Sequence, residues 1–339
     1  MIINLKSNTA DSDIRELMSR LAKEKLTVFP VGRNPIVKVV VNGSVTEAFV
    51  GELENHPAVE SISQTNGKKY KLTSRLAQSN NTIINVNGLA IGGENIVIMA
   101  GPCSVENTEQ ITRIAHEIKK AGANVLRGGA YKPRTAPYDF QGLEKAGLKF
   151  LRSAAQKTNL PIITEVLDPR DVEIIEKETD IFQVGTRNMQ NYALLKELGT
   201  TRKPVLLKRG MWASYSEFLL AAEYIMVGGN PNVILCERGI RTHVAELRFT
   251  LDLNAIPYLK KESHLPIIVD PSHGTGRRDL VLPMSKAAIA AGADGLIIET
   301  HYDPEHSLSD ADQTISITDF AQLVGEVEKI AHAVGRTRI

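Results

Sequence analysis

The stretch IVIMAGPCSVENTEQITRIAHEIKKAGANVLRGGA (residues 96–130) contains one complete strand–helix–strand unit. Its two ends, 96–103 and 125–130, are nearly continuous apolar runs, which is typical of parallel strands that are covered by helices. Between these runs, apolar residues from Ile111 to Ala121 recur at the spacing of one helix face. The stretch therefore predicts a βαβ unit, in which a helix joins two parallel strands.

The same alternation continues to the end of the chain. Further strands are predicted at 161–166, 181–186, 204–210, 233–238, 266–273 and 295–301. Helical patterns lie between them, and they include 143–158, 217–227, 282–291 and a last helix at 318–334. Eight βα units within about 240 residues predict an α/β fold of the TIM (β/α)8 barrel type over residues 96–339. A doubly wound open sheet is the alternative, but no glycine-rich dinucleotide loop follows the first strand.

Residues 1–72 predict a small ferredoxin-like α+β domain ahead of the barrel. Its strands alternate with two helices in the order β-α-β-β-α-β, and they are expected at 2–6, 26–31, 36–41 and 59–64, with a continuation at 70–72. Asp11 and Ser12 are the predicted caps of the first helix, and a turn is expected at Gly32-Arg33-Asn34-Pro35. Acid–base and metal-binding residues do not concentrate here. The domain is therefore either a regulatory ligand-binding unit or a purely structural cap.

Residues 73–95 are expected to connect the two domains. The polar stretch 74–81 has the composition of a linker, and Asn87-Gly88 between the apolar runs 82–86 and 89–91 is a strong hairpin signal. A hairpin at this place is expected to close the bottom of the barrel.

The composition argues against several classes of protein. A length of 339 residues suits two domains, and 42% apolar residues are enough to build a full core. Forty Lys and Arg against 39 Asp and Glu give a net charge of +1, which gives no support for a nucleic-acid partner. Two cysteines, Cys103 and Cys236, cannot form a disulfide framework and suit a reducing cytoplasm. No apolar run approaches the roughly 18 residues of a membrane span, and we see no secretory signal, so we expect a cytoplasmic protein with no membrane partner.

Polar or ionisable residues occur at the carboxyl end of every predicted strand or in the loop after it. They are Cys103, Arg127, Glu165, Arg187, Lys208, Arg238, His273 and Glu299. Any one of them, taken alone, is more often a surface ion pair or a packing residue. The full set lies on the rim from which TIM barrels build their active sites, and it therefore predicts an active site there.

These residues and their neighbours divide into two groups. The first group is cationic and suits phosphate and carboxylate oxygens, so it predicts strongly anionic substrates such as phosphate esters: Arg127, Lys132, Arg134, Arg187, Lys208 and Arg238. The second group combines Cys103, His273 and Glu299 with Asp310, for which Asp312 is an alternative. A thiolate, an imidazole and two carboxylates suit a divalent metal ion, although their spacing matches no zinc-finger signature.

Six segments closely resemble the 3-deoxy-D-arabino-heptulosonate 7-phosphate (DAHP) synthases, in the branch that also contains the 3-deoxy-manno-octulosonate 8-phosphate synthases. They are GPCSVE (101–106), LRGGAYKPRTAPYDFQG (126–142), GTRNMQN (185–191), LLKRG (206–210), LCERGIRT (235–242) and DPSHGTGRRDLV (270–281). The resemblance spans essentially the whole predicted barrel. Residues 1–72 resemble the ferredoxin-like regulatory domain of some members rather than the helical chorismate mutase domain of others.

The resemblance implies that phosphoenolpyruvate condenses with erythrose 4-phosphate to give DAHP and phosphate, the first step of the shikimate pathway. From the matching positions of the family's motifs, phosphoenolpyruvate would be held by Arg127, Lys132, Arg187, Lys208 and Arg238. Arg134 and Thr135 would hold erythrose 4-phosphate, and the Pro133-Arg134-Thr135 sequence favours that sugar over arabinose 5-phosphate. One divalent ion, Mn²⁺ in the first place and Fe²⁺, Co²⁺ or Zn²⁺ otherwise, would be bound by Cys103, His273, Glu299 and Asp310.

The expected chemistry follows from the substrates. A divalent ion polarises the aldehyde that is attacked by phosphoenolpyruvate, and the cations hold the phosphate and carboxylate in a dry pocket. We expect Lys132, Cys103 and His273 to be catalytic. Glu165 either assists proton transfer near Lys132 or is only a partner of the cationic group.

Three other functions use the same residues differently. An octulosonate phosphate synthase would take arabinose 5-phosphate, and a Schiff-base aldolase would use Lys208 or Lys132 as its nucleophile. A sugar-phosphate sensor on a degenerate barrel is disfavoured because no expected catalytic position is lost. The resemblance further implies a homotetramer that is feedback-inhibited by tyrosine or phenylalanine, with the effector bound between the N-terminal domains of neighbouring subunits.

Overall fold

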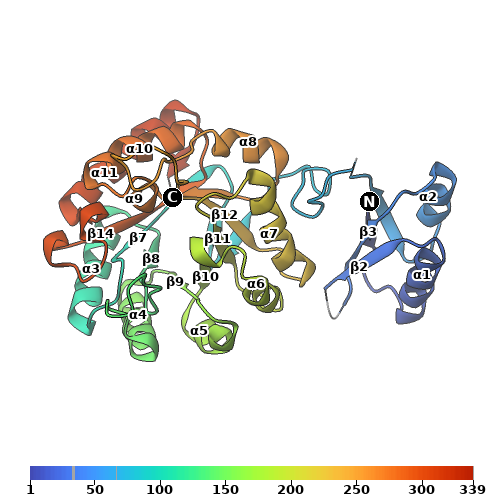
Figure 1. The fold of residues 1–339 in the computed structure, drawn as a ribbon, viewed down its shortest axis with the longest axis horizontal. Helices are drawn as coiled ribbons and strands as arrows, with labels where there is room; N and C mark the ends of the chain where they lie inside the picture. Colours follow the sequence, from blue (N-terminus) through green and yellow to red (C-terminus); the bar gives the residue numbers. More distant parts are fainter. Residues whose placement is uncertain (33–34, 66, 339) are drawn as a thin grey trace.

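The computed structural model describes residues 1–32, 35–65 and 67–338. The chain forms a barrel ringed by helices and a smaller N-terminal domain at one side of it (Figure 1). None of the described helices is long and apolar enough to cross a membrane.

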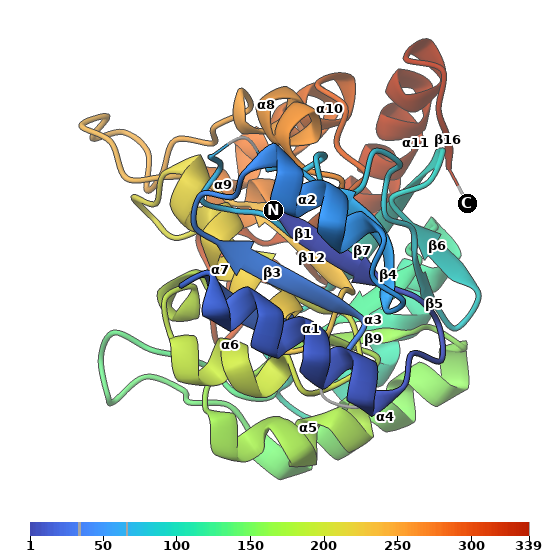
Figure 2. The same cartoon turned by 90° about the vertical axis from the view of Figure 1, so that its right-hand side faces the viewer.

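The N-terminal domain has the predicted ferredoxin-like topology. Its antiparallel sheet has the order β2-β3-β1-β4 and consists of β1 (Ile2–Leu5), β2 (Thr27–Val31), β3 (Lys38–Asn42) and β4 (Val59–Ser63). The helices α1 (Asp11–Lys23) and α2 (Glu47–Glu54) lie on the face of the sheet that is turned away from the barrel (Figure 2). Leu17, Leu21 and Leu53 from these helices pack with Ile3 and Val39 from the sheet in a separate small core.

The structure contradicts two local predictions in this domain, and a third falls partly on residues that it does not describe. Asp11 and Ser12 do not cap the first helix, because both are inside it and Ala10 precedes it without a side-chain hydrogen bond. Residues 70–72 form no strand in the described sheet. Arg33 and Asn34 of the predicted turn lie outside the described residues.

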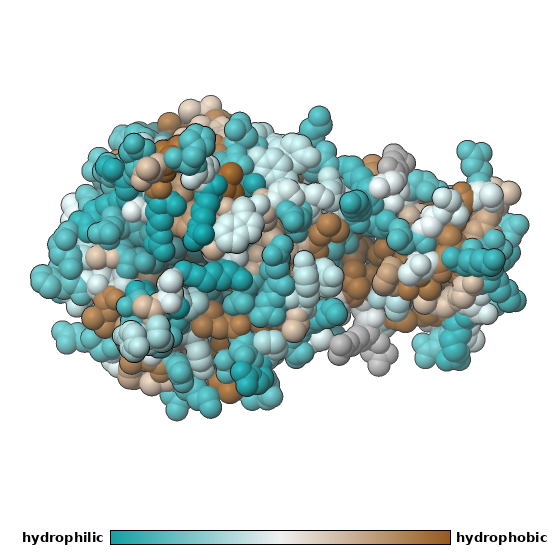
Figure 3. Space-filling model, viewed as in Figure 1, coloured by the Kyte–Doolittle hydropathy of each residue, from teal (hydrophilic) through white to brown (hydrophobic). Residues whose placement is uncertain are grey.

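The segment that follows β4 is tied to the barrel by hydrogen bonds. The backbone N–H and the hydroxyl of Thr73 both donate to the buried carboxylate of Glu223 in helix α7 (Tyr215–Val227). The His264 imidazole contacts the Leu72 carbonyl oxygen through Nε2 and the Thr82 hydroxyl through Nδ1, each at 2.7 Å. In Figure 3, hydrophobic residues gather where the N-terminal domain meets the barrel. The part of the chain that sequence composition assigned to a linker is thus partly buried.

The barrel consists of eight parallel strands and closes through pairing of β14 with β7. The strands are β7 (Asn95–Gly101), β8 (Val125–Arg127), β9 (Ile162–Glu165), β10 (Ile181–Val184), β11 (Val205–Lys208), β12 (Val233–Glu237), β13 (Ile267–Val269) and β14 (Gly295–His301). This confirms the predicted TIM-barrel fold. The predicted strand 266–273 is shorter than expected, because Pro271–Thr275 forms the short helix α9 and carries His273.

Helices on the outside cover the strands (Figure 1). They are α3 (Thr108–Ala121), α4 (Glu144–Thr158), α5 (Val172–Glu178), α6 (Tyr192–Leu198), α7, α8 (Ala255–Glu262), α10 (Arg278–Ala290) and α11 (Ile317–Ala333). The hairpin of β5 (Ile84–Val86) and β6 (Leu89–Ile91) packs Ile84, Val86 and Ile91 against side chains from the starts of the barrel strands. The hairpin thus fills the centre of this end with apolar side chains, and the open pocket lies at the opposite end.

Candidate active site

A polar pocket opens at the carboxyl ends of the barrel strands. Its lining combines cations, candidate metal ligands and loop residues: Arg127, Lys132, Pro133, Arg134, Thr135, Asp139, Glu165, Gln183, Gly185, Thr186, Arg187, Lys208, Met211, Arg238, Arg248, Phe249, His273 and Asp310. The structure therefore brings the whole predicted cationic group to one cavity. Cys103 and Glu299 lie buried beside it.

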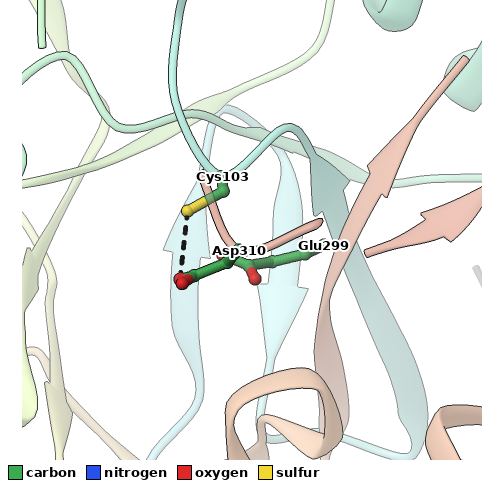
Figure 4. Close-up of side chains that lie close together, drawn as sticks. All are labelled: Cys103, Glu299 and Asp310. Atoms are coloured by element: carbon green, nitrogen blue, oxygen red, sulfur yellow. Dashed lines mark hydrogen bonds between the residues drawn. The ribbon is translucent and has the colours of Figure 1, made fainter. Parts of the chain in front are cut away.

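Three candidate metal ligands converge in this region. Cys103 Sγ, a carboxylate oxygen of Glu299 and one of Asp310 all lie within 4.8 Å of one another (Figure 4). Cys103 Sγ is 3.4 Å from Asp310 Oδ2. His273 Nε2 approaches the same group, at 3.4 Å from Glu299 Oε1 and 3.7 Å from Asp310 Oδ2. His273 thus lies beside two of the three clustered donors, whereas Asp312 lines a different surface cavity.

Backbone geometry places two of these donors. Gly101 ends β7 with φ +148°, and a Cβ there would collide with the carbonyl oxygen of Arg127. The glycine therefore permits the chain to turn sharply two residues before Cys103. Asp310 has a left-handed backbone with φ +53°, a conformation that is uncommon for residues other than glycine. Strained residues of this kind cluster at functional sites.

Burial and neighbouring charges shift the pKa values of two of these donors, Cys103 and Asp310. Burial, together with the Glu299 carboxylate, raises the pKa of the Cys103 thiol to about 12. Burial also opposes the ionisation of Asp310, but the charges of His273 and Lys132 outweigh it and lower the pKa of Asp310. The thiolate is the form that binds metals, and a divalent ion at this place would supply the positive charge that favours it.

Two cations of the pocket contact the candidate metal ligands directly. Arg127 Nη1 donates to Glu299 Oε1 at 2.8 Å and to the Pro102 carbonyl oxygen at 2.9 Å. Lys132 Nζ lies 3.0 Å from Cys103 Sγ and 3.1 Å from the Cys103 carbonyl oxygen. Both cations are buried. The anion pocket and the candidate metal site are therefore adjacent parts of one hydrogen-bonded region.

Arg238 is held by packing and leaves donors for a ligand. Its guanidinium lies 3.9 Å from the centre of the Phe249 ring, and its Nη1 reaches the Gly239 carbonyl oxygen at 3.4 Å. Burial lowers the pKa of Arg238 to about 10, so it stays charged at neutral pH. Its buried Nε has no hydrogen-bond partner among the described residues. An unpaired buried donor of this kind is costly unless a ligand accepts from it.

The outer residues of the pocket are more exposed. Arg134 Nη2 lies 3.5 Å from Asp139 Oδ2, and Arg187 Nη2 lies 3.4 Å from the Thr135 hydroxyl. Arg187, which the resemblance assigned to phosphoenolpyruvate, thus contacts a residue of the predicted sugar phosphate site. Glu165 is buried and packs so closely on Gly185 that a Cβ there would collide with it.

Sequence reasoning missed three residues of this region. Gln313 Nε2 donates to Glu299 Oε2 at 2.5 Å, and Gln313 Oε1 accepts from Arg248 Nη1 at 3.3 Å. The buried Asp270 contacts both Lys208 and His273. Only Asp270 carries a local signal, since it precedes His273 in the segment DPSH at the end of a predicted strand.

A family model described as the DAHP synthetase I family matches residues 76–334. The chain belongs to this family. It is 45% identical to the phospho-2-dehydro-3-deoxyheptonate aldolase of Thermotoga maritima over 335 residues. These aligned residues cover 99% of each protein. A crystal structure of a phospho-2-dehydro-3-deoxyheptonate aldolase (DAHP synthase) from the same organism has a TM-score of 0.80 at 44% identity, covering 100% of this chain and 99% of that one.

The relationship extends to the octulosonate branch. The 2-dehydro-3-deoxyphosphooctonate aldolase of Syntrophobacter fumaroxidans is 28% identical over 269 residues, which cover 74% of this chain and 92% of that protein. The match to the heptonate enzyme is both closer and longer than this one, since it includes the N-terminal domain.

Proposed function

We propose that this chain is a DAHP synthase, which condenses phosphoenolpyruvate with erythrose 4-phosphate to give DAHP and phosphate. The observation that carries the proposal is a pocket with seven cationic side chains, counting Arg248, beside a cluster of three candidate metal ligands and the adjacent His273. Membership of the DAHP synthetase I family and the full-length match to a heptonate enzyme support the same reaction.

The donor set fits a divalent ion. Cys103, His273, Glu299 and Asp310 offer one sulfur, one nitrogen and carboxylate oxygens, which suits Mn²⁺, Fe²⁺, Co²⁺ or Zn²⁺. We expect Mn²⁺ to serve. When bound, the ion acts as a Lewis acid that polarises the aldehyde of the sugar phosphate.

The buried cations hold phosphoenolpyruvate. Arg127, Lys132, Lys208 and Arg238 converge on the inner part of the pocket, where they bind its phosphate and carboxylate. The C2 atom of phosphoenolpyruvate gains positive character when C3 attacks the aldehyde, and water adds there before phosphate leaves. Fixed cations in a site that excludes water keep both anionic groups in place during these charge changes.

The outer residues hold the sugar phosphate. Arg134 and Thr135 lie at the mouth, and the Arg187 contact with Thr135 places a second guanidinium beside them. Arg187 can therefore bind phosphoenolpyruvate from a position next to the residues proposed for the sugar phosphate. Lys132, between Cys103 and the cavity, is placed to donate a proton, and the buried Glu165 lies in the same pocket, where its charge favours the protonated form of Lys132.

The test is a phosphate-release assay with phosphoenolpyruvate and either erythrose 4-phosphate or arabinose 5-phosphate, with and without Mn²⁺. We expect release with erythrose 4-phosphate that stops after exhaustive chelation and returns with the ion. Preference for the pentose would indicate an octulosonate phosphate synthase. A borohydride-trapped adduct on Lys208 or Lys132, or full activity after chelation, would indicate a Schiff-base aldolase.

We also propose that residues 1–70 are a feedback sensor in a homotetramer, with tyrosine or phenylalanine as the effector. The domain has its own core and borders a cavity lined by Phe29, Val40 and Tyr224, and the segment after it is tied to α7 by the Thr73–Glu223 contact. Effector binding would stabilise a domain arrangement that blocks the barrel mouth.

Activity of the full chain is measured with each aromatic amino acid and compared with a variant that lacks residues 1–70, and light scattering gives the mass of both. We expect the full chain to be an inhibited tetramer and the shortened chain to be active without inhibition. A full chain that ignores both amino acids would leave the domain a structural cap.

A further inference from the structure

Asp270 is a buried carboxylate between two functional side chains, and sequence reasoning gave it no role. It follows strand β13 and precedes helix α9, and its side chain is 1% exposed. Its Oδ1 accepts from the His273 backbone N–H at 2.9 Å and thereby caps the helix. Its Oδ2 lies 2.8 Å from His273 Nδ1 and 2.5 Å from Lys208 Nζ. One oxygen atom therefore contacts a candidate metal ligand and a candidate phosphoenolpyruvate ligand.

The contact with Nδ1 decides which nitrogen of His273 is free. A carboxylate accepts hydrogen bonds only, so Nδ1 carries a proton and Nε2 is the nitrogen left for a metal ion. Nε2 is the nitrogen that faces Glu299 and Asp310, at 3.4 and 3.7 Å. Carboxylates that accept from the far nitrogen of a histidine are the usual device by which proteins orient a metal-binding imidazole.

The contact with Lys208 fixes a second group. The Lys208 ammonium is 5% exposed and lines the pocket, and a flexible four-carbon side chain needs a partner to keep one position. Asp270 supplies that partner from the neighbouring part of the rim. The two sites are thus connected through a single carboxylate.

We propose that Asp270 is a positioning residue that orients His273 for the metal ion and Lys208 for phosphoenolpyruvate through the same oxygen. This proposal rests on the proposed function for the identity of the anion. A purely structural role, capping of helix α9, is the competing interpretation.

The substitution Asp270→Asn separates the two interpretations. Its amide oxygen still caps the helix, because asparagine is as good a cap as aspartate. Its NH2 group, however, donates to Nδ1 and thereby places the imidazole proton on Nε2, the nitrogen that must bind the metal. The change also removes the charge that holds Lys208. Capping predicts no effect of this variant on metal binding, whereas positioning predicts a loss.

Affinity for Mn²⁺ and Co²⁺ is measured by competition with a chelator, and phosphoenolpyruvate binding by calorimetry, so neither readout depends on turnover. We expect Asp270→Asn to weaken metal binding by about 10- to 100-fold, to change the absorption spectrum of the Co²⁺ form, and to weaken phosphoenolpyruvate binding. Asp279→Asn is the matched control, because Asp279 is exposed and pairs with Arg277 away from the pocket. It should change neither affinity. Wild-type affinity for the metal in a folded Asp270→Asn variant would overturn the proposal.

Two further variants keep the test decisive. Asp270→Ser retains a capping hydroxyl but is too short to reach Nδ1, so it should lose metal affinity as well if Asp270→Asn does not fold. Adding Asp270→Asn to His273→Ala should cause no further loss of metal affinity, since the residue acts through His273. An additional loss would contradict the proposal. Failure of the wild-type chain to release phosphate would instead contradict the proposed function and leave the metal measurements valid.

Discussion

The two ends of the barrel both bury charged side chains, but they pair them differently. At the bottom, the Asp294 carboxylate accepts from the Ile267 backbone N–H and from Lys260, each at 2.8 Å, and from Arg336 at 3.1 Å. Arg336 also donates to backbone carbonyl oxygens, among them those of Gly93 and Ala293. This network lies where the last helix and the C-terminal segment meet the starts of the strands.

At the mouth, positive charge is in excess and part of it is unpaired. The buried Nε atoms of Arg127 and Arg238 have no hydrogen-bond partner within residues 1–32, 35–65 and 67–338. Buried donors without acceptors destabilise a protein, and Arg127 and Arg238 line a cavity in which a ligand can accept from them. At the bottom, the charges pair with one another and with backbone groups, whereas at the mouth several cations face a cavity that can take an anionic ligand. Substitutions at the mouth should change activity, and those at the bottom should change stability.

The largest effect on activity is expected at the candidate metal ligands. Cys103→Ser and His273→Ala should lower metal affinity by more than the about 10- to 100-fold associated with residues that only orient a ligand. Both variants should fold, because these residues lie on the rim and not in the core. Elemental analysis and chelator competition measure the metal, and far-ultraviolet circular dichroism checks the fold. Full metal occupancy with normal turnover in either variant would remove that residue from the site.

The bottom of the barrel should show the opposite pattern. Asp294→Ala leaves Arg336, Lys260 and the Ile267 N–H without their shared acceptor, and leaving a buried donor unsatisfied costs about 1–3 kcal/mol. We expect the free energy of unfolding to fall by about that amount in urea titrations. The kcat/KM of the folded fraction at 25 °C should stay unchanged. A loss of kcat/KM without a loss of stability would contradict the proposed difference between the two ends of the barrel.

A smaller and more selective effect is expected from Arg238→Lys. Lysine keeps the charge but lacks the planar fork, so one charge-assisted hydrogen bond of about 1.5–3 kcal/mol is lost. The KM for phosphoenolpyruvate should therefore rise by about tenfold or more, while the KM for erythrose 4-phosphate changes little. Steady-state kinetics with each substrate varied in turn gives both values. Equal changes in the two constants would mean that Arg238 does not act on phosphoenolpyruvate specifically.

The smallest effect concerns pH and the junction between the domains. Burial lowers the pKa of His264 below its usual 6.5, so the unfolded chain binds this proton more readily than the folded one. The stabilisation from neutral His264 is complete above pH 6.5 and is lost as the pH falls through and below that value. We expect the Tm to fall between pH 7 and pH 5, and less steeply in His264→Gln. His306→Gln is the control, because exposed His306 has a pKa raised by its hydrogen bond to Asp303, which reverses the sign. An unchanged slope in His264→Gln would show that other groups govern the acid sensitivity.

The barrel and its rim could be predicted from local sequence patterns. Apolar runs and helical spacing are local consequences of burial, so the alternation of 96–130 and its repeats predicted strands close to those observed. Residues at strand ends meet at one rim whenever parallel strands form a barrel. That rule placed Arg127, Lys208 and Glu299 together without any knowledge of their contacts. The DPSH and KPRT segments were recognisable because they are continuous in the chain.

The contacts between individual side chains of the site follow only from the three-dimensional packing. Arg127 and Glu299 are 172 residues apart, and their 2.8 Å contact depends on the closure of the barrel between β7 and β14. The choice of Asp310 over Asp312 depends on one left-handed residue in a loop, and the burial of Thr73 depends on a carboxylate in α7. The Asp270 oxygen joins two rim segments that no sequence period relates. Periodicity reports how a residue is buried within its own element, whereas hydrogen bonds between loops are set by the packing of elements that are distant in the chain.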